Sequence, residues 1–227
     1  SYRAEKVIEA GFAEACVKAT SLDNLFCPVG GNETMANAAS ALGMEATAKE
    51  PMIAVVRCSG SPDNRPKTSV YNGASTCAIA SMVYSGDTGC PNGCLGLGDC
   101  VTACKFDAIY IDKTTNLPVV DGEKCTACGA CIKACPKAII ELRYKGKKDR
   151  RIFVSCINTE KGGIAKKSCQ VACIGCGKCV KVCAFDAIKL ENNLAYIDFE
   201  KCKLCRKCVE ECPTGAIHEL NFPPRKI

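Results

Sequence analysis

Residues Cys125–Ile139 read CTACGACIKACPKAI, and the prediction of the fold rests on this stretch. Its four cysteines are separated by two, two and three residues, and a proline follows the last one. This spacing is typical of chains that hold [4Fe–4S] clusters in pairs. Three closely spaced thiolates surround one face of a four-iron cube, and the fourth cysteine of the run ligates the other cluster of the pair. The stretch therefore predicts an iron–sulfur fold.

Three further runs of cysteines are similar to the first. Cys202–Ile217 (CKLCRKCVEECPTGAI) has the same spacing and proline, whereas Cys173–Ile188 (CIGCGKCVKVCAFDAI) has the spacing without the proline. In Cys90–Ile109 (CPNGCLGLGDCVTACKFDAI) the cysteines are separated by three, five and three residues. Because all four runs end in Ala-Ile, we interpret the irregular run as the same motif with one and three residues inserted between its ligands.

The chain also repeats over a longer distance. Each half has two isolated cysteines upstream of its paired runs: Cys58 and Cys77, then Cys156 and Cys169. A basic loop, residues 143–152 (RYKGKKDRRI), separates the halves. We predict an α+β fold of two tandem ferredoxin-like two-[4Fe–4S] units, residues 51–143 and 152–222, plus a small N-terminal helical segment, residues 1–50. Within that segment, Thr34–Ala48 is rich in alanine and predicts a helix.

In a pair of clusters the fourth cysteine of each run ligates the cluster of the other run. Applied to this chain, the exchange predicts four [4Fe–4S] clusters, and removal of the metal should unfold the units that they tie together. The ligand sets are Cys90, Cys94, Cys100 and Cys135; Cys104, Cys125, Cys128 and Cys131; Cys173, Cys176, Cys179 and Cys212; and Cys183, Cys202, Cys205 and Cys208. We predict no catalytic residue, because the chemistry of such a chain belongs to its cofactors. The single histidine, His218, is expected at the surface.

Three interpretations of Cys58, Cys77, Cys156 and Cys169 stay open. They can be buried thiols that pack as small hydrophobic side chains, form a disulfide in each half, or ligate an extra metal centre. Their recurrence in both halves indicates a shared structural position. An iron count separates these interpretations, because four clusters need about sixteen irons per chain and a fifth cluster needs about twenty.

Composition and charge argue against other classes of protein. The chain has 227 residues and 22 cysteines, whose tight spacing suits metal chelation better than disulfide cross-linking of distant segments. The formal charge of +6 counts thiols as neutral. Each oxidised cluster with its thiolates carries about −2, so four clusters bring the net charge to about −2 and remove the case for nucleic-acid binding. Paired CxxC motifs also bind zinc, but three closely spaced cysteines and a fourth after three residues fit a tetrahedral zinc site poorly.

The order of the motifs resembles one family. CPVGG at Cys27–Gly31, EPMIAVVRCSG at Glu50–Gly60 and GCLGLGDCVTACKFDAI at Gly93–Ile109, followed by a regular run with proline, are similar to the B subunit of the Rnf complex. The resemblance covers nearly the whole chain, and the second pair of motifs looks like the longer B subunits of anaerobic bacteria. It implies an electron-transfer subunit of a membrane ferredoxin:NAD oxidoreductase that translocates sodium ions or protons.

The resemblance also implies partners and a location. The partners would be soluble ferredoxin and the other Rnf subunits, with no nucleic acid, at the cytoplasmic face of the cell membrane. The family has an N-terminal membrane helix, which this chain lacks. No apolar run here approaches the ~20 residues that cross a bilayer, so we expect the chain as given to be soluble.

The family also has an N-terminal cluster, held by a C-G-x-C-G-x-x-G-C loop and the cysteine of the CPxGG segment. Here Val7–Ala10 runs directly into Gly11–Ala19, where that loop is expected. We therefore interpret residues 1–50 as the remnant of an iron–sulfur domain without its cysteine loop. Cys27 is expected to be a ligand only where the native protein contains the loop, because Cys16 and Cys27 alone cannot hold a cluster.

Two other functions stay open. The chain can be a polyferredoxin subunit of a soluble bifurcating or hydrogenase-type enzyme, or a non-redox protein whose clusters are structural. The chain alone is expected to carry electrons without reducing NAD, because it contains neither a GxGxxG motif in a βαβ setting nor a P-loop. The basic residues of the loop between the halves form either a solvated turn or a docking site for an acidic ferredoxin. They are Lys145, Lys147, Lys148, Arg150 and Arg151.

Overall fold

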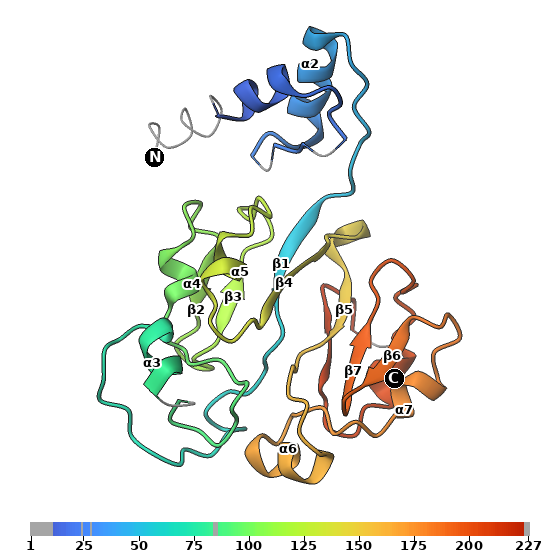
Figure 1. Ribbon diagram of the computed structural model, residues 1–227. Helices are drawn as coiled ribbons and strands as arrows, with labels where there is room; N and C mark the ends of the chain where they lie inside the picture. The colour runs from blue at the N-terminus through green and yellow to red at the C-terminus, as the bar shows by residue number, and fades with distance from the viewer. Residues whose placement is uncertain (1–10, 24, 28, 84–85, 225–227) are drawn as a thin grey trace. The chain divides into compact units, whose positions relative to one another are not determined.

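The computed structural model describes residues 11–23, 25–27, 29–83 and 86–224 (Figure 1). The chain divides into two compact units. We call them the N-terminal unit (residues 1–51 with 126–128) and the main unit (residues 52–125 with 129–227). Val7–Ala10, beside the position expected for the missing cysteine loop, lies outside the described residues.

The described part of the N-terminal unit is mainly helical. Residues 11–18 form a helix, and α2 spans Gly31–Leu42. The sequence predicted the second helix over Thr34–Ala48, but α2 ends at Leu42 because Gly43 adopts the left-handed conformation, with φ of 64°, that commonly ends helices. Cys16 and Cys27 are buried in the core of this unit, together with Leu22, Met35 and Ala39.

The main unit repeats the same order of elements in its two halves. The first half contains β1 (Met52–Val56), α3 (Cys77–Val83), α4 (Asp99–Thr102), β2 (Ile109–Ile111), β3 (Pro118–Val120), α5 (Ala130–Ala134) and β4 (Ile140–Tyr144). The second half contains β5 (Arg151–Val154), α6 (Gly162–Ser168), α7 (Lys178–Lys181), β6 (Ile188–Glu191), β7 (Leu194–Ile197), α8 (Lys207–Glu210) and β8 (Ile217–Leu220). A short 3₁₀ helix, η1 (Lys147–Asp149), connects them.

Strand pairing repeats in the same way. In each half the first strand pairs antiparallel with the last, β1 with β4 and β5 with β8. The two inner strands form a hairpin, β2 with β3 and β6 with β7. Both cysteine runs of a half lie between its first and last strands in the sequence, so pairing these strands brings the ends of the half together. The repeat therefore exists in the fold, while the predicted domain boundaries stay predictions.

Every cysteine run leads into a strand through the same backbone turn. The third residue after the last cysteine has a positive φ in each case: Asp107 (49°), Ala138 (51°), Asp186 (49°) and Gly215 (67°). Two residues later a strand begins with a buried isoleucine: Ile109, Ile140, Ile188 and Ile217. The alignment of Ala138-Ile139 with the other Ala-Ile pairs is therefore shifted by one residue, because Ala138 occupies the left-handed position.

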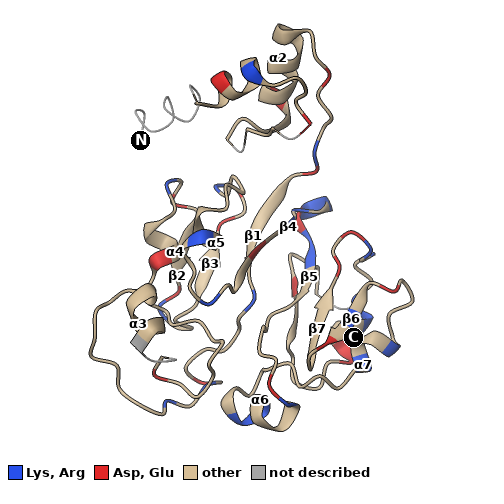
Figure 2. Ribbon diagram, viewed as in Figure 1, with Lys and Arg blue, Asp and Glu red and all other residues tan. Residues whose placement is uncertain are grey.

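The connection between the halves is a tight basic turn. Lys147 and Lys148 are exposed, and Figure 2 shows Lys and Arg residues gathered along η1 and the start of β5. Arg151 forms an ion pair with Asp149, and the Asn221 side-chain amide donates a hydrogen bond of 2.9 Å to the Asp149 carbonyl oxygen. These contacts fix the turn and leave the two lysines extended into solvent.

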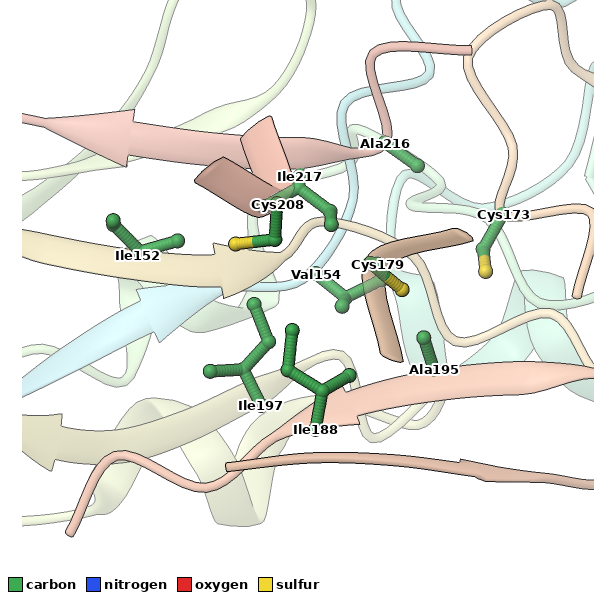
Figure 3. Close-up of a cluster of buried hydrophobic side chains, with 10 residues drawn as sticks. All are labelled: Ile152, Val154, Cys173, Cys179, Ile188, Ala195, Ile197, Cys208, Ala216 and Ile217. Atoms are coloured by element: carbon green, nitrogen blue, oxygen red, sulfur yellow. The ribbon is translucent and has the colours of Figure 1, made fainter. Parts of the chain in front are cut away.

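Aliphatic side chains and cysteines share the core of each half. Figure 3 shows Val154 and Ile217 between Cys208 on one side and Cys173 and Cys179 on the other, with Ile197 packed in the same cluster. The corresponding core of the first half contains Ala54, Ile109, Leu117, Ile139 and Ile140 with Cys94 and Cys100. Because cysteines line the apolar core directly, any group that they bind becomes part of the packing that stabilises the fold.

A buried arginine joins the two halves. Arg143 of β4 is 1% exposed, and it donates hydrogen bonds to the Ile197 carbonyl oxygen at 2.9 Å and to the Glu141 carboxylate at 2.5 Å. Its guanidinium also lies 5.8, 5.1 and 5.5 Å from the ring centres of Phe153, Tyr196 and Phe199. All three rings belong to the second half, so the charged side chain of Arg143 attaches the first half to the second.

We expect Arg143→Ala to lower the free energy of unfolding of the main unit by about 3 kcal/mol or more, because removing one partner of a buried ion pair costs about 3–5 kcal/mol. Far-UV circular dichroism on heating without oxygen gives the stability. Arg206→Ala is the matched control, since Arg206 pairs with Glu219 and stacks on Phe222 but is 20% exposed and lies within the second half. Equal losses in the two variants would contradict this role of Arg143.

Candidate metal centres

Three hollows of the main unit are each lined by four cysteines from separate parts of the sequence. They contain Cys77, Cys94, Cys100 and Cys135; Cys173, Cys176, Cys179 and Cys212; and Cys183, Cys202, Cys205 and Cys208. Their volumes are about 360, 350 and 310 Å³, and each is partly open to solvent. We call them the first-half hollow, the inner hollow and the outer hollow, in that order. Four thiols around one hollow are the donor set that a [4Fe–4S] cluster requires.

The second half brings together both ligand sets that the sequence predicted. In the inner hollow, Cys179 lies on α7, and Cys212 arrives from just after α8. In the outer hollow, Cys208 lies on α8, and Cys183 arrives from just after α7. The exchange of the fourth cysteine between two neighbouring runs is therefore a feature of the fold.

The first half differs from its prediction. Cys94, Cys100 and Cys135 line one hollow, as the sequence indicated, but the fourth cysteine there is Cys77. Cys90, which the spacing grouped with them, lines a different hollow. The turn at Pro91–Gly93 separates Cys90 from Cys94, and the Gly93 N–H bonds to the Cys90 carbonyl oxygen at 3.3 Å.

The backbone explains why Cys90 is displaced. Two glycines with positive φ frame the middle of each run: Gly96 (72°) and Gly98 (86°) in the first half, Gly175 (64°) and Gly177 (71°) in the second. Helix α4 begins after the second glycine, as α7 does. Aligned on these glycines, Cys94 corresponds to Cys173 and Leu97 corresponds to Cys176. On this alignment the run is the regular motif with leucine in place of its second cysteine, whereas the sequence predicted one and three inserted residues.

Cys77 replaces the missing cysteine from another part of the chain. It is the first residue of α3, where the Asp99 carboxylate accepts hydrogen bonds from the N–H groups of Cys77 at 2.7 Å and Ala78 at 3.0 Å. Asp99 is also the first residue of α4, so it ties the start of α3 to the helix that carries Cys100. Sequence reasoning missed this role, although the shared glycine spacing of CLGLGDC and CIGCGKC carried the signal.

The cysteines of the fourth predicted set belong to both units of the chain. Cys104, Cys125 and Cys131 pack against the buried core of the first half. The Cys104 sulfur accepts a hydrogen bond of 3.4 Å from the Ala108 N–H. Cys128 is exposed and belongs to the N-terminal unit. This set, Cys104 with Cys125, Cys128 and Cys131, therefore stays a prediction of the spacing.

Burial favours the protonated form of several thiols in these hollows. Burial raises the pKa of Cys94 and Cys100 to about 12, and that of Cys179 to about 11, with neighbouring cysteines adding to each rise. Backbone N–H groups oppose the effect, and Gly96 donates to the Cys94 sulfur at 3.4 Å. Since thiolates are the metal-binding form, iron must displace protons from these sulfurs.

The remaining cysteines fall into two places. Cys58, Cys156 and Cys169 line a fourth hollow together with Cys90, whereas Cys16 and Cys27 lie in the core of the N-terminal unit. All 22 cysteines are within the described residues and none forms a disulfide, so the alternative of a disulfide in each half is wrong. In the described part of the chain, no three His, Cys, Asp or Glu side chains are close enough to hold a single metal ion.

His218 also differs from its prediction. It was expected at the surface, but it is partly buried on β8, with its ring 6.5 Å from that of Phe153. Burial lowers its pKa, so the ring is neutral at physiological pH.

Two domain families match the chain. A 4Fe-4S dicluster domain matches residues 88–139 and 172–216, and a 4Fe-4S double cluster binding domain matches residues 124–186. These matches cover the cysteine runs that line the first-half, inner and outer hollows. The cofactors of the chain are therefore [4Fe–4S] clusters.

Three curated relatives extend the match beyond these domains. The B subunit of the Na(+)-translocating ferredoxin:NAD(+) oxidoreductase complex of Acetobacterium woodii is 47% identical over 191 residues, which cover 84% of this chain and 56% of the relative. The B subunit of the proton-translocating ferredoxin:NAD(+) oxidoreductase complex of Clostridium ljungdahlii is 40% identical over 211 residues, covering 92% and 73%. The B subunit of the ion-translocating oxidoreductase complex of Methanosarcina acetivorans is 40% identical over 208 residues, covering 92% and 77%. The chain belongs to this family of B subunits.

Membership confirms the resemblance to the Rnf B subunit, and the domain matches make the chain an iron–sulfur protein. The chain spans little more than half, 56%, of the length of the Acetobacterium woodii relative. Among the residues that the structure describes, no helix is both long and apolar enough to cross a bilayer.

Proposed function

We propose that this chain relays single electrons from reduced ferredoxin to the other subunits of an ion-translocating ferredoxin:NAD oxidoreductase. The observation that supports it best is the succession of cysteine-lined hollows within one compact unit of a chain that belongs to the family of B subunits. The fold that carries them consists of two tandem ferredoxin-like units behind a small N-terminal helical segment. We place the chain at the cytoplasmic face of the membrane, where a soluble ferredoxin has access to it.

The residues present fit [4Fe–4S] clusters. Each hollow offers four thiols, and backbone N–H groups point at the sulfurs, as Gly96 does at Cys94 and Leu204 does at Cys202. A [4Fe–4S] cluster, when bound, takes up and gives back one electron, at a potential set by such hydrogen bonds, nearby charge and solvent access. The chain's own residues would hold the sulfurs, exclude water with Ile and Val side chains, and stabilise the added charge with amide dipoles.

The exposed cysteine of each regular run indicates where electrons enter or leave. Cys176 and Cys205 are exposed, whereas Cys173, Cys179 and Cys208 are buried. Each second cysteine therefore brings the edge of its hollow to the surface, where a partner can approach. The first-half hollow has Leu97 at this position, and Leu97 is only partly exposed.

We infer that the basic turn between the halves contributes to docking of an acidic ferredoxin. Lys147 and Lys148 extend from η1, which is held in place by Asp149 and Asn221 (Figure 2). Two exposed positive charges on a fixed turn attract an acidic partner over about a Debye length, roughly 8–10 Å at physiological salt. The effect acts on the rate of encounter more than on the affinity.

Lys147→Gln with Lys148→Gln should lower the second-order rate of electron transfer from an acidic ferredoxin about two- to tenfold at low salt and flatten its dependence on salt. Stopped-flow reduction of the holo chain measures the rate. Lys166→Gln with Lys167→Gln on α6 is the matched control, because these two lysines are also adjacent and exposed. If both pairs have the same effect, net charge rather than the turn is responsible.

EPR-monitored redox titration of the anaerobically prepared chain tests the function itself. We expect several low-potential one-electron centres that are reduced and reoxidised reversibly while the far-UV circular dichroism stays unchanged. Clusters that resist reduction, or that are reduced only as the chain unfolds, would mean a structural role and would refute electron relay.

A further inference from the structure

The fourth hollow of the main unit is lined by cysteines that lie outside the regular motifs. It contains Cys58, Cys90, Cys156 and Cys169. Cys58 follows β1 and Cys156 follows β5 at equivalent positions of the repeat, and Cys169 follows α6. Two of the four cysteines come from each half. The hollow has a volume of about 310 Å³, equal to that of the outer hollow with its complete ferredoxin ligand set.

Hydrogen bonds converge on the sulfurs of this hollow. The Cys94 N–H donates to the Cys58 sulfur at 3.4 Å, and the Asn158 N–H donates to the Cys156 sulfur at 3.5 Å. Backbone N–H groups of Asn92 and Gly93 bond to the Cys90 sulfur, and that of Val171 bonds to the Cys169 sulfur. Every cysteine of the hollow therefore has an amide directed at it, as ligands of iron–sulfur clusters do.

The side chain of Asn158 links the halves at the same place. It is fully buried, and its amide nitrogen lies 3.8 Å from the Cys90 sulfur and donates to the Glu160 carboxylate at 3.0 Å. The Glu160 N–H in turn donates to the Asn158 side-chain oxygen at 2.8 Å. These bonds orient the amide so that a donor from the second half faces a thiol of the first.

A buried cation beside the hollow has no anionic partner among the described residues. Arg65 is 6% exposed, and its guanidinium donates to three neutral acceptors: the Gly60 and Cys94 carbonyl oxygens, at 2.6 and 2.8 Å, and the Thr88 hydroxyl, at 3.3 Å. It lines the hollow and interacts electrostatically with Cys90 and Cys169. Burying an uncompensated charge is costly, so the site is built for a negative group in the hollow.

Two glycines leave room for that arginine. A methyl group on Gly93 would lie 2.1 Å from a terminal nitrogen of Arg65, and one on Gly60 would lie 2.5 Å from its Cδ atom. The backbone on both sides thus leaves room for the guanidinium next to Cys90. This close packing indicates that the Arg65 guanidinium has a preformed position beside the hollow.

The hollow adjoins the ligands of both neighbouring centres. Cys94, whose N–H bonds to Cys58, lines the first-half hollow. Cys173, whose N–H bonds to Cys156, lines the inner hollow. A redox centre here would be one hydrogen bond away from a ligand of each half, and would connect the two halves.

From these observations we propose that Cys58, Cys90, Cys156 and Cys169 bind a fifth [4Fe–4S] cluster, which links the cluster pairs of the two ferredoxin-like halves. We assign Cys77, in place of Cys90, to the first-half cluster. Five clusters then use twenty of the 22 cysteines, and the two left over are Cys16 and Cys27, which lie in the core of the N-terminal unit. The proposal rests on the proposed function for its cofactor type, but its test separates the two.

The iron content of the purified holo chain is the first test, and it needs no substitution. The proposal predicts about twenty irons and twenty sulfides per chain, against about sixteen for the four motif clusters alone. About sixteen irons with reversible redox activity would overturn the fifth cluster and leave the proposed function intact. Absence of iron, or zinc in its place, would overturn both.

Single substitutions then locate the fifth cluster. Cys169→Ser should lower the content, by about one iron where a three-iron cluster remains and by about four where the cluster is lost, and should remove one [4Fe–4S] centre from the EPR titration. Cys16→Ser is the matched control, as Cys16 is also a buried free thiol, and should change neither value. If Cys27→Ser removes the extra irons and Cys169→Ser does not, the fifth cluster belongs to the N-terminal unit and the proposal fails.

Arg65→Gln provides a readout that keeps every cysteine in place, should Cys169→Ser fail to fold. Removing a positive charge beside the hollow disfavours the reduced form, so one centre should shift to a more negative reduction potential. Lys67→Gln is the control, because Lys67 is near in sequence but its side chain is 66% exposed. Unchanged potentials in Arg65→Gln would contradict a cluster in this hollow.

Discussion

Removal of iron from the holo chain should abolish the cooperative unfolding transition of the main unit. Three of the ten residues in the buried core of the second half are cysteines, Cys173, Cys179 and Cys208. Without clusters, the hollows that these cysteines line are cavities in the core. The thiols also lose the metal that holds distant segments of the chain together. The hydrophobic contribution of the few remaining aliphatic side chains is small for a chain held by two-stranded sheets.

The measurement compares holo and iron-free chains by far-UV circular dichroism and limited proteolysis. Iron is removed by a chelator under reducing, anaerobic conditions, so that disulfides cannot form. Adding ferrous iron and sulfide to the same sample should restore the signal and the protease resistance, which shows that the loss is not chemical damage. An iron-free chain that still melts cooperatively would disprove the view that the clusters stabilise this fold.

Substitution of Cys77, the fourth cysteine of the first-half hollow, should cause a large loss of iron from the chain. Cys77→Ser is expected to remove about four irons, although Cys77 lies far from any regular motif. Adding Leu97→Cys to this variant recreates the C-x2-C-x2-C-x3-C spacing, because Leu97 occupies the place of the second cysteine in the run. The double variant should therefore regain the lost cluster, as measured by iron content and by the number of EPR-active centres.

A matched pair of variants makes this rescue specific. Cys90→Ser should also lose about four irons, but from the hollow between the halves, so adding Leu97→Cys should not restore them. If Leu97→Cys rescues Cys90→Ser and not Cys77→Ser, then the grouping of Cys90 with Cys94, Cys100 and Cys135 is correct after all. In that case the assignment of Cys77 to this hollow has to be abandoned.

Much of the architecture could be predicted because it depends on local spacing. In the second half, two, two and three residues between cysteines are enough to place Cys173, Cys176 and Cys179 around one hollow. The spacing also explains why Cys212 is the fourth, since the last cysteine of a run leads through a fixed turn into a strand. These relations involve neighbours in the chain, so the sequence carries them directly.

The misreading of the irregular run has a physical origin. Counting residues between cysteines treated Cys90 as a ligand of the nearest motif and required insertions to fit it. The backbone conformation is set by Gly96 and Gly98 instead, which fix the loop as in the regular runs. Once Leu97 takes the place of a ligand, a donor must come from elsewhere, and α3 supplies it through the contact of Cys77 with Asp99.

The type of cofactor, the repeat and the grouping of cysteines around each hollow of the second half could be predicted, because these follow from spacing along a short stretch of chain. The tertiary structure was needed to show which isolated cysteines line the same hollow. Cys58 and Cys156 are 98 residues apart, and they converge because equivalent strands, β1 and β5, end side by side where the two halves pack. Arg57 bonds there to the carbonyl oxygens of Val154 and Cys156, both at 3.2 Å. Convergence of this kind depends on packing between distant segments, which no local spacing rule can express.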